Sequence, residues 1–350
     1  MMANKPKYTI AVTALNAIDS PGPGVSVIRA LKDAESFEVR IIGLAYETLE
    51  PGIYMHDLVD KTYLIPYPSA GADALSARLY EIHQLEKLDM VIPNFDAELF
   101  SFIRLSNQLK IWGIHTFLPT EEQFNERHKH NLVEFGEKHS IIVPRSKAIF
   151  EKSGIAPLAD EYSYPLVVKG KFYEAGIAYN SEQAYSYFDK ISAKWGLPII
   201  IQEYIQGTEF NVTGLGDGKG NTIAAIPMRK QYITDKGKAW GGITVADNKM
   251  LELTRHFISS THWRGGFELE LMKDKNGVFY LLEINPRMPA WIYLSVGAGQ
   301  NIPEALVKLA MGMNPEPFKT YESAKMFIRY AWDMIVDIKD FEQISMHGEL

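Results

Sequence analysis

The stretch from Trp263 to Arg287 contains the residues of this chain whose types and spacing are best suited to chemistry. Two runs of alternating apolar residues, Phe267 to Met272 and Val278 to Ile284, flank the turn-forming residues 273–277. Two such runs around a short polar turn are typical of a β-hairpin. The sequence therefore predicts a hairpin whose strands carry acidic side chains at alternate positions.

Alternation places Glu268 and Glu270 on one side of the first strand, and Glu283 and Asn285 on one side of the second. Neighbouring like charges repel, so this side needs water or a cation. Two carboxylates and a carboxamide are hard oxygen ligands that suit Mg²⁺, and Arg287 could hold an anion beside the metal. The alternative is that these acids lie on the solvent face of an edge hairpin.

The composition excludes several classes of protein. With 350 residues, the chain is long enough for two or three lobes, and 46% hydrophobic with 23% charged residues is ordinary for a globular protein. A net charge of -7 argues against a broad nucleic-acid surface. The absence of cysteine excludes disulfides, a thiolate nucleophile and Cys-ligated zinc.

The chain shows no membrane signal. No apolar run reaches the roughly 20 residues that span a bilayer. The polar N-terminal residues 1–7 are followed by a run that resembles a strand, not the core of a signal peptide. We therefore expect a cytoplasmic protein that binds neither membrane nor nucleic acid.

The first third of the sequence alternates between strand and helix patterns, which predicts a parallel sheet covered on both faces. Asp96 and Glu98 follow one strand end, where open parallel sheets place ligands; the alternative is that Asp96 caps a helix. The expected strands are Tyr8–Leu15, Phe37–Leu44, Asp60–Ile65, Met90–Pro93 and Ile111–Gly113, and the expected helices are Val25–Lys32, after a glycine turn, and Ala72–Lys87.

The middle of the chain carries basic residues at positions suited to anions. The run Arg127–Gly136 predicts a helix that begins with a basic cluster, and Lys169 and Lys171 end a predicted strand. Arg229 lies in a further strand pattern and could contact substrate or simply be exposed. We interpret Gly237–Thr244 as a mobile loop, 302–311 as a helix and 324–335 as a final strand.

These motifs together resemble the ATP-grasp superfamily. Gly176-Ile177-Ala178-Tyr179-Asn180 and Glu283-Ile284-Asn285-Pro286-Arg287 are similar to the carbamoyl-phosphate-synthetase-like branch. The resemblance is strong from about residue 120 to 318 and weak before that. The residues that follow the order and approximate spacing of the ATP contacts in ATP-grasp enzymes are Lys129, Lys169, Glu203, Glu209, Glu270, Glu283, Asn285 and Arg287.

The resemblance implies a mixed α/β and α+β fold. A Rossmann-like preATP-grasp domain would occupy residues 1–120. Two α+β lobes with ATP between them would follow, a small lobe at 121–205 and a large lobe at 206–350 that includes the C-terminal strand. A homodimer is compatible with the family.

The resemblance also implies the role of each site residue. ATP would be held by Lys129, Lys169 and Lys171 at the phosphates, by Glu203 with the backbone of Tyr204 and Ile205 at the adenine, and by Glu209 at the ribose. One or two Mg²⁺ ions, with Mn²⁺ as an alternative, would be held by Glu270, Glu283 and Asn285. The catalytic residues would be Arg287, Lys169 and Arg229.

The implied activity is that of a ligase. ATP would phosphorylate a small carboxylate substrate, and an amine would attack the acyl-phosphate. Two alternatives remain open, an enzyme that phosphorylates bicarbonate or carbamate and a nucleotide-binding protein without catalysis. The last is suggested by Gly170–Gly176, a shorter and less glycine-rich flap than family members usually carry.

Overall fold

The computed structural model describes residues 5–18, 20–171, 174–234 and 237–350 of the chain. The chain divides into two compact units. The first unit comprises Met1–Glu121, Val212–Glu268 and Asn285–Leu350, and the second comprises Glu122–Asn211 and Leu269–Ile284. The division at residues 120 and 205 inferred from the sequence stays a prediction.

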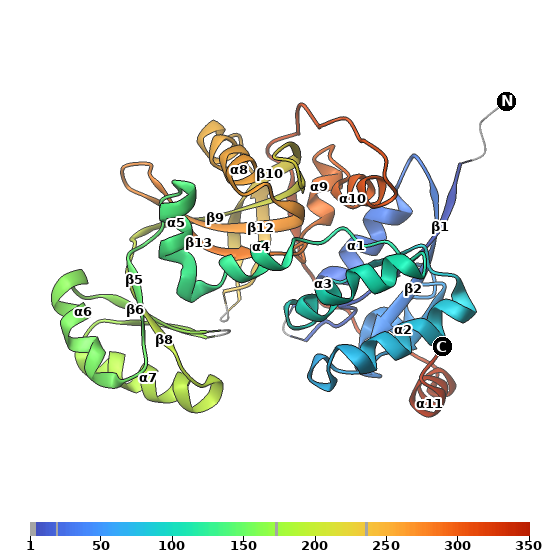
Figure 1. The fold of residues 1–350 in the computed structure, drawn as a ribbon, viewed down its shortest axis with the longest axis horizontal. Helices are drawn as coiled ribbons and strands as arrows, with labels where there is room; N and C mark the ends of the chain where they lie inside the picture. Colours follow the sequence, from blue (N-terminus) through green and yellow to red (C-terminus); the bar gives the residue numbers. More distant parts are fainter. Residues whose placement is uncertain (1–4, 19, 172–173, 235–236) are drawn as a thin grey trace. The chain divides into compact units, whose positions relative to one another are not determined.

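The first unit contains the predicted parallel sheet, with strand order β3-β2-β1-β4 and parallel pairing throughout (Figure 1). The central strand β1 is fully buried at Ile10, Ala11 and Val12, as expected for a sheet covered on both faces. Its strands are β1 (Lys7–Val12), β2 (Glu38–Ala45), β3 (Lys61–Leu64) and β4 (Met90–Ile92), and its helical elements are α1 (Pro23–Lys32), η1 (Pro51–Tyr54), η2 (Pro68–Ala70), α2 (Ala72–Glu86) and α3 (Asp96–Ile111).

The expected strand at Ile111–Gly113 is wrong. Ile111 is the last residue of helix α3, and Gly113 adopts a φ of 88° in the turn that follows. After this turn, His115 forms an isolated bridge to the sheet, beside Met90. Three residues are too few for hydrophobic periodicity to separate a strand from a helix end.

The glycine turn brings helix α1 directly against the end of strand β1. The amide of Gly24 donates to the carbonyl of Ala14 at 3.0 Å, and that of Gly22 donates to the carbonyl of Asn16 at 2.7 Å. A Cβ on Gly24 would lie 2.1 Å from the carbonyl oxygen of Thr13. Close packing therefore requires glycine at position 24. Residue 19 of the same turn lies outside the described residues.

We expect Gly24→Ala to lower the free energy of unfolding by about 1–3 kcal/mol, because the added methyl group forces the backbone of α1 away from β1. Urea denaturation measures this loss. Gly297→Ala is the matched control, since a Cβ there meets nothing within 4 Å and should change stability by less than about 1 kcal/mol. Equal midpoints for the two variants would contradict the packing argument.

A six-stranded sheet with order β13-β12-β9-β10-β11-β14 contains the predicted hairpin, and the partition into units passes within β9, β12 and β13. Its strands are β9 (Gly207–Asp217), β10 (Thr222–Ile233), β11 (Ala239–Thr244), β12 (Arg264–Asp274), β13 (Phe279–Asn285) and β14 (Met326–Ile328). The helices of this part of the chain are α8 (Asn248–Thr261), α9 (Tyr293–Gly297), α10 (Ile302–Ala310) and α11 (Ile338–His347).

Two expectations about this region are wrong. Ala239–Thr244 is not a mobile loop but strand β11, which pairs with both β10 and β14. The last strand covers only Met326–Ile328, and the chain ends in helix α11. Glycine in β11 allows side chains of the neighbouring strands to approach closely, since Gly242 lies against Met228 of β10 and Phe327 of β14.

The second unit is built on an antiparallel sheet with strand order β5-β8-β6-β7 (Figure 1). Helices α6 and α7 bury Leu158 and Phe188 in a core with Val168 and Ile201 of the sheet. The strands are β5 (Ser146–Ile149), β6 (Leu166–Gly170), β7 (Ala175–Ala178) and β8 (Ile199–Glu203), and the helical elements are α4 (Glu121–Glu126), η3 (Lys129–Asn131), α5 (Leu132–His139), η4 (Lys152–Gly154), α6 (Ile155–Tyr162) and α7 (Ser181–Trp195).

The predicted helix Arg127–Gly136 is only partly correct. Helix α5 begins at Leu132, and Lys129–Asn131 forms a separate 3₁₀ turn before it. Lys129 and His130 therefore precede the first turn of the α-helix and do not lie within it. Of the residues described, none belongs to a helix long and apolar enough to span a membrane.

Candidate functional site

Lys169 is the central cation of the second unit. Strand alternation buries Leu166 and Val168 of β6 in the core and places Lys169 on the opposite face. Burial of its ammonium lowers the pKa of Lys169 to about 8, against the nearby charge of Glu283, which raises it. The charge of Lys129 lowers the pKa further, so a second cation lies close by.

Lys129 and Glu283 form an ion pair within the same unit. The Lys129 Nζ lies 3.1 Å from Glu283 Oε2, and both side chains are mostly shielded from solvent, at 19% and 27% exposure. Burial raises the pKa of the Glu283 carboxyl, Lys129 lowers it, and the charge of Glu270 raises it again. Glu209 also acts on Lys169 through its charge. Five predicted site residues thus lie together in one unit.

The hairpin carboxylates have the chemistry of a Mg²⁺ site. After burial, the charge of Glu270 also raises the pKa of the Glu283 carboxyl, and a divalent cation would relieve the repulsion between the two carboxylates. Asn285 follows two positions after Glu283 in strand β13, so its carboxamide points to the same side of the strand. Among the described residues, no group of three or more His, Cys, Asp or Glu forms a competing metal site. The residues present fit Mg²⁺.

The residues expected to bind adenine lie at the end of strand β8. The Glu203 carboxylate accepts hydrogen bonds from the Arg145 backbone amide at 2.7 Å and from its Nε at 2.8 Å. Tyr204 and Ile205 follow in an irregular segment that joins β8 to β9, with partly exposed side chains. Their contact with adenine stays a prediction. The sequence reading missed Arg145, which lies 58 residues away in the chain.

Arg287 belongs to the first unit, where it contacts helix α3. Its Nε donates to Asp96 Oδ2 at 2.8 Å, and its Nη1 donates to the carbonyl of Met288 at 3.3 Å. The alternative of Asp96 as a helix cap is wrong, because Glu98 accepts from the amide of Phe95 at 2.9 Å instead. Asp96 therefore orients the arginine whose predicted role is to contact the transferred phosphoryl group.

Glu98 is the centre of a buried network at the carboxyl ends of strands β1, β2 and β4. It accepts hydrogen bonds from the Thr13 hydroxyl at 2.5 Å, from the Tyr46 hydroxyl and from the amide of Asn94 at 2.9 Å. Burial raises the pKa of Glu98 to about 7, although these hydrogen bonds lower it. The sequence located Glu98 but gave no signal for Thr13 or Tyr46, which precede it by 85 and 52 residues.

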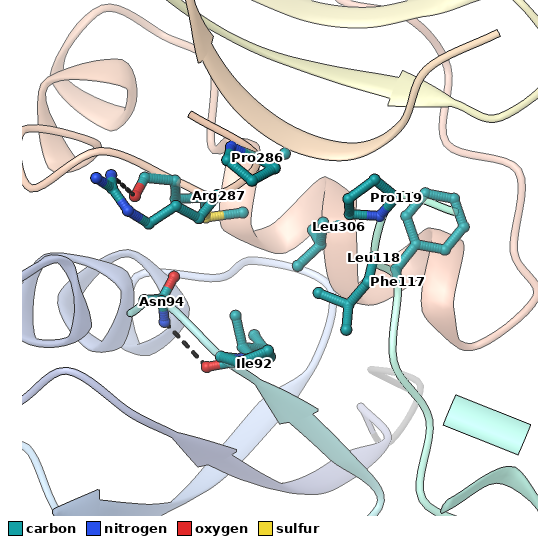
Figure 2. Close-up of a pocket in the computed structure, with 11 residues that line it drawn as sticks. Ile92, Asn94, Phe117, Leu118, Pro119, Pro286, Arg287 and Leu306 are labelled. Atoms are coloured by element: carbon teal, nitrogen blue, oxygen red, sulfur yellow. Dashed lines mark hydrogen bonds between the residues drawn. The ribbon is translucent and has the colours of Figure 1, made fainter. Parts of the chain in front are cut away.

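A small pocket of the first unit lies beside this network (Figure 2). Its volume of about 20 Å³ is that of one water-sized molecule. The Asn94 Nδ2 donates to the carbonyl of Ile92 at 2.9 Å, and Figure 2 shows Arg287 across the pocket from it. The other lining residues are mostly apolar and include Phe117, Leu118 and Leu306.

Two further predicted residues have less support. Arg229 is exposed on strand β10, and its Nη2 donates to Gln231 Oε1 at 3.2 Å, as on an ordinary strand surface. Lys171 follows the end of β6, and its charge lowers the pKa of His130. The next two flap positions, 172 and 173, lie outside the described residues. The roles of Arg229 and Lys171 stay predictions.

Comparison with known proteins finds sequence similarity over much of the chain. Residues 197–332 match the model of a family described as "ATP-grasp in the biosynthetic pathway with Ter operon". The chain is 25% identical over 313 residues to the carbamoyl phosphate synthase large chain of Clostridium beijerinckii, covering 82% of this chain. It spans only 27% of the length of that relative.

Solved structures share the fold at low sequence identity. The biotin carboxylase domain dimer of 2-oxoglutarate carboxylase from Hydrogenobacter thermophilus, in complex with MgADP, ADP and bicarbonate, has a TM-score of 0.70 at 16% identity, covering 89% of this chain and 71% of that one. The L-amino acid ligase of Bacillus licheniformis has a TM-score of 0.65 at 16% identity, covering 89% and 76%. The predicted fold is confirmed, because the chain shares the fold of these solved structures. In sequence, the chain is similar to the carbamoyl phosphate synthase large chain, and its residues 197–332 are similar to an ATP-grasp family.

Proposed function

We propose that this chain is an ATP-dependent ligase that joins a small carboxylate to an amine. ATP transfers its γ-phosphoryl group to the carboxylate, which gives an acyl-phosphate and ADP. The amine then attacks the acyl carbon, loses a proton, and phosphate leaves as the amide bond forms. The observation that carries this proposal is the cluster of Lys129, Lys169, Glu270 and Glu283, which pairs cations for a polyphosphate with carboxylates for its metal.

Phosphoryl transfer depends on neutralising charge and holding the reactants in line, more than on a protein nucleophile. Lys169 and Lys129 would neutralise the phosphate oxygens from the second unit. Arg287, oriented by Asp96, would neutralise charge on the transferred group. Glu270, Glu283 and Asn285 would hold Mg²⁺, which supplies charge stabilisation at the β- and γ-phosphates.

The L-amino acid ligase neighbour supports an amino acid as one substrate. Measuring ADP release with pooled amino acids, each then omitted in turn, tests this. We expect release that requires two amino acids or one amino acid and another small acid. ATP binding without turnover, with every acceptor offered, would favour the nucleotide-binding alternative.

A second candidate is an enzyme that phosphorylates bicarbonate. Two observations favour it, the similarity to the carbamoyl phosphate synthase large chain and a structural neighbour solved with bicarbonate. The same assay with bicarbonate as the sole acceptor separates the candidates, because only this one releases ADP without an organic carboxylate. A homodimer, as in that neighbour, and use of Mn²⁺ belong to the proposal as well.

A further inference from the structure

Glu268 is a buried carboxylate of strand β12 that the proposed reaction does not use directly. The residue is only 6% exposed and lies within the first unit. Its Oε1 accepts a hydrogen bond from the Trp291 indole Nε1 at 2.7 Å, and its Oε2 accepts one from the Asn285 Nδ2 at 3.1 Å. Both donors are themselves buried, at 5% and 7% exposure. The carboxylate is therefore fixed at both oxygens.

The guanidinium of Arg329, in the same unit, interacts electrostatically with the Glu268 carboxylate. Burial lowers the pKa of the Arg329 guanidinium to about 10, against the charge of Glu268, which raises it. Arg329 thus remains positively charged at neutral pH. Its Nη1 donates to the Ser20 hydroxyl, and its backbone amide donates to the carbonyl of Trp240 at 3.0 Å. Both oxygens of the Glu268 carboxylate act as acceptors in this arrangement.

The hydrogen bond between Glu268 and Asn285 selects one of two orientations of the carboxamide. A carboxamide has a donor end, Nδ2, and an acceptor end, Oδ1, which are related by a half-turn of the side chain. If Oδ1 faced Glu268, two acceptors would meet in a buried place where neither could be hydrated. The Glu268 carboxylate therefore accepts from Nδ2 and directs Oδ1 away from itself.

We propose that Glu268 is a positioning residue that orients Asn285 for cation binding. A divalent cation needs the oxygen of the carboxamide, and Glu268 holds the nitrogen on the other side. The Trp291 indole donates to Glu268 and fixes its carboxylate, and the fixed carboxylate orients the carboxamide of Asn285. This inference rests on the proposed function, because that function makes Asn285 a metal ligand.

The test is direct binding of Mn²⁺ in the presence of ADP, followed by electron paramagnetic resonance. We expect Glu268→Gln to weaken Mn²⁺ binding by about 10–100-fold, the range found when outer-sphere partners of metal ligands are changed. Glutamine has nearly the same shape, but it offers a donor as well as an acceptor to Asn285. The carboxamide is then free to turn, and its oxygen no longer faces the cation in every molecule.

A second background isolates orientation from folding. In Asn285→Asp, the side chain presents oxygen on both sides, so there is no orientation for Glu268 to select. We therefore expect Glu268→Gln to weaken Mn²⁺ binding in the natural background, and to leave it unchanged or strengthen it in the Asn285→Asp background. A merely structural role would give the same loss in both backgrounds and would overturn the proposal.

Glu304→Gln is the matched control for loss of a buried carboxylate. Glu304 is 7% exposed, lies in the first unit, and accepts hydrogen bonds from Ser36, remote from the hairpin in sequence. The Glu304→Gln variant should have lower thermal stability than the unchanged protein but the same affinity for Mn²⁺. If Asn285→Ala also leaves Mn²⁺ affinity unchanged, the metal assignment of the proposed function fails. If Asn285→Ala weakens binding but Glu268→Gln does not, only the positioning role fails.

Discussion

Glu283→Gln is expected to reduce Mg²⁺-dependent ATP turnover by at least about 100-fold, the loss typical of removing one electrostatic contact to a transition state. Glu283 is the carboxylate that faces Lys129 at 3.1 Å and that raises the pKa of Lys169. Glutamine keeps the shape but removes the charge that is proposed to hold the metal and that acts on both lysines. Turnover is measured as ADP release at saturating ATP over a range of Mg²⁺ concentrations.

The control for this variant is Glu252→Gln, which changes an exposed carboxylate of helix α8. It should retain the turnover of the unchanged protein. Circular dichroism must show that Glu283→Gln is folded, because a lysine left beside a neutral group alters the local charge balance. A folded Glu283→Gln variant with unchanged Mg²⁺ dependence would remove Glu283 from the metal site.

The affinity for ATP is expected to fall as pH rises through about 8, because Lys169 loses its charge there. The protonated form binds the anionic phosphates, so the dissociation constant should be flat below this pH and rise by up to tenfold per unit above it. Calorimetric titration with ATP between pH 6.5 and 9.5 gives the profile.

Lys169→Arg is the matched variant for this profile. Arginine stays charged across the range, so the inflection near pH 8 should disappear even if the affinity itself is lower. Lys169→Met should lose affinity at every pH, with no inflection. An inflection that persists in Lys169→Arg would assign the titration to another group.

The same lowered pKa has a consequence for stability in the absence of ATP. Between about 8 and the ordinary value of 10.5, the folded protein binds fewer protons at Lys169 than the unfolded chain does. Stability therefore rises with pH across this window, opposite to the trend in ATP affinity. Stability that rises with pH while ATP affinity falls would indicate that both depend on the same buried lysine, Lys169.

Local patterns in the sequence were sufficient for much of the fold. The hairpin follows from alternation and from a turn in which the Asp274 carboxylate accepts hydrogen bonds from the amides of Asn276 and Val278, at 2.9 and 2.8 Å. The parallel sheet follows from alternating strand and helix patterns. Errors fell where the local signal was short or ambiguous, as at Ile111–Gly113 and in the glycine-rich strand β11.

Part of the candidate site was also predictable, because its residues form short motifs on single strands. The two-residue spacing of Glu283 and Asn285 is enough to place them on one face of strand β13. Lys169 lies on the face of β6 opposite the buried residues Leu166 and Val168. Their chemistry and order were sufficient to suggest ATP and Mg²⁺.

Strand alternation and turn preferences act over a few residues, so local sequence was enough to predict the strands, the helices and the kinds of side chain at their ends. Which buried polar groups meet depends instead on how the strands and helices pack. Glu268 and Glu270 are equivalent by alternation, yet Glu268 contacts Trp291, 23 residues further along the chain. Glu98 likewise meets Thr13 across 85 residues. Such contacts depend on strand neighbours that no local pattern encodes, since each buried carboxylate takes whichever donors the packed sheet brings to it.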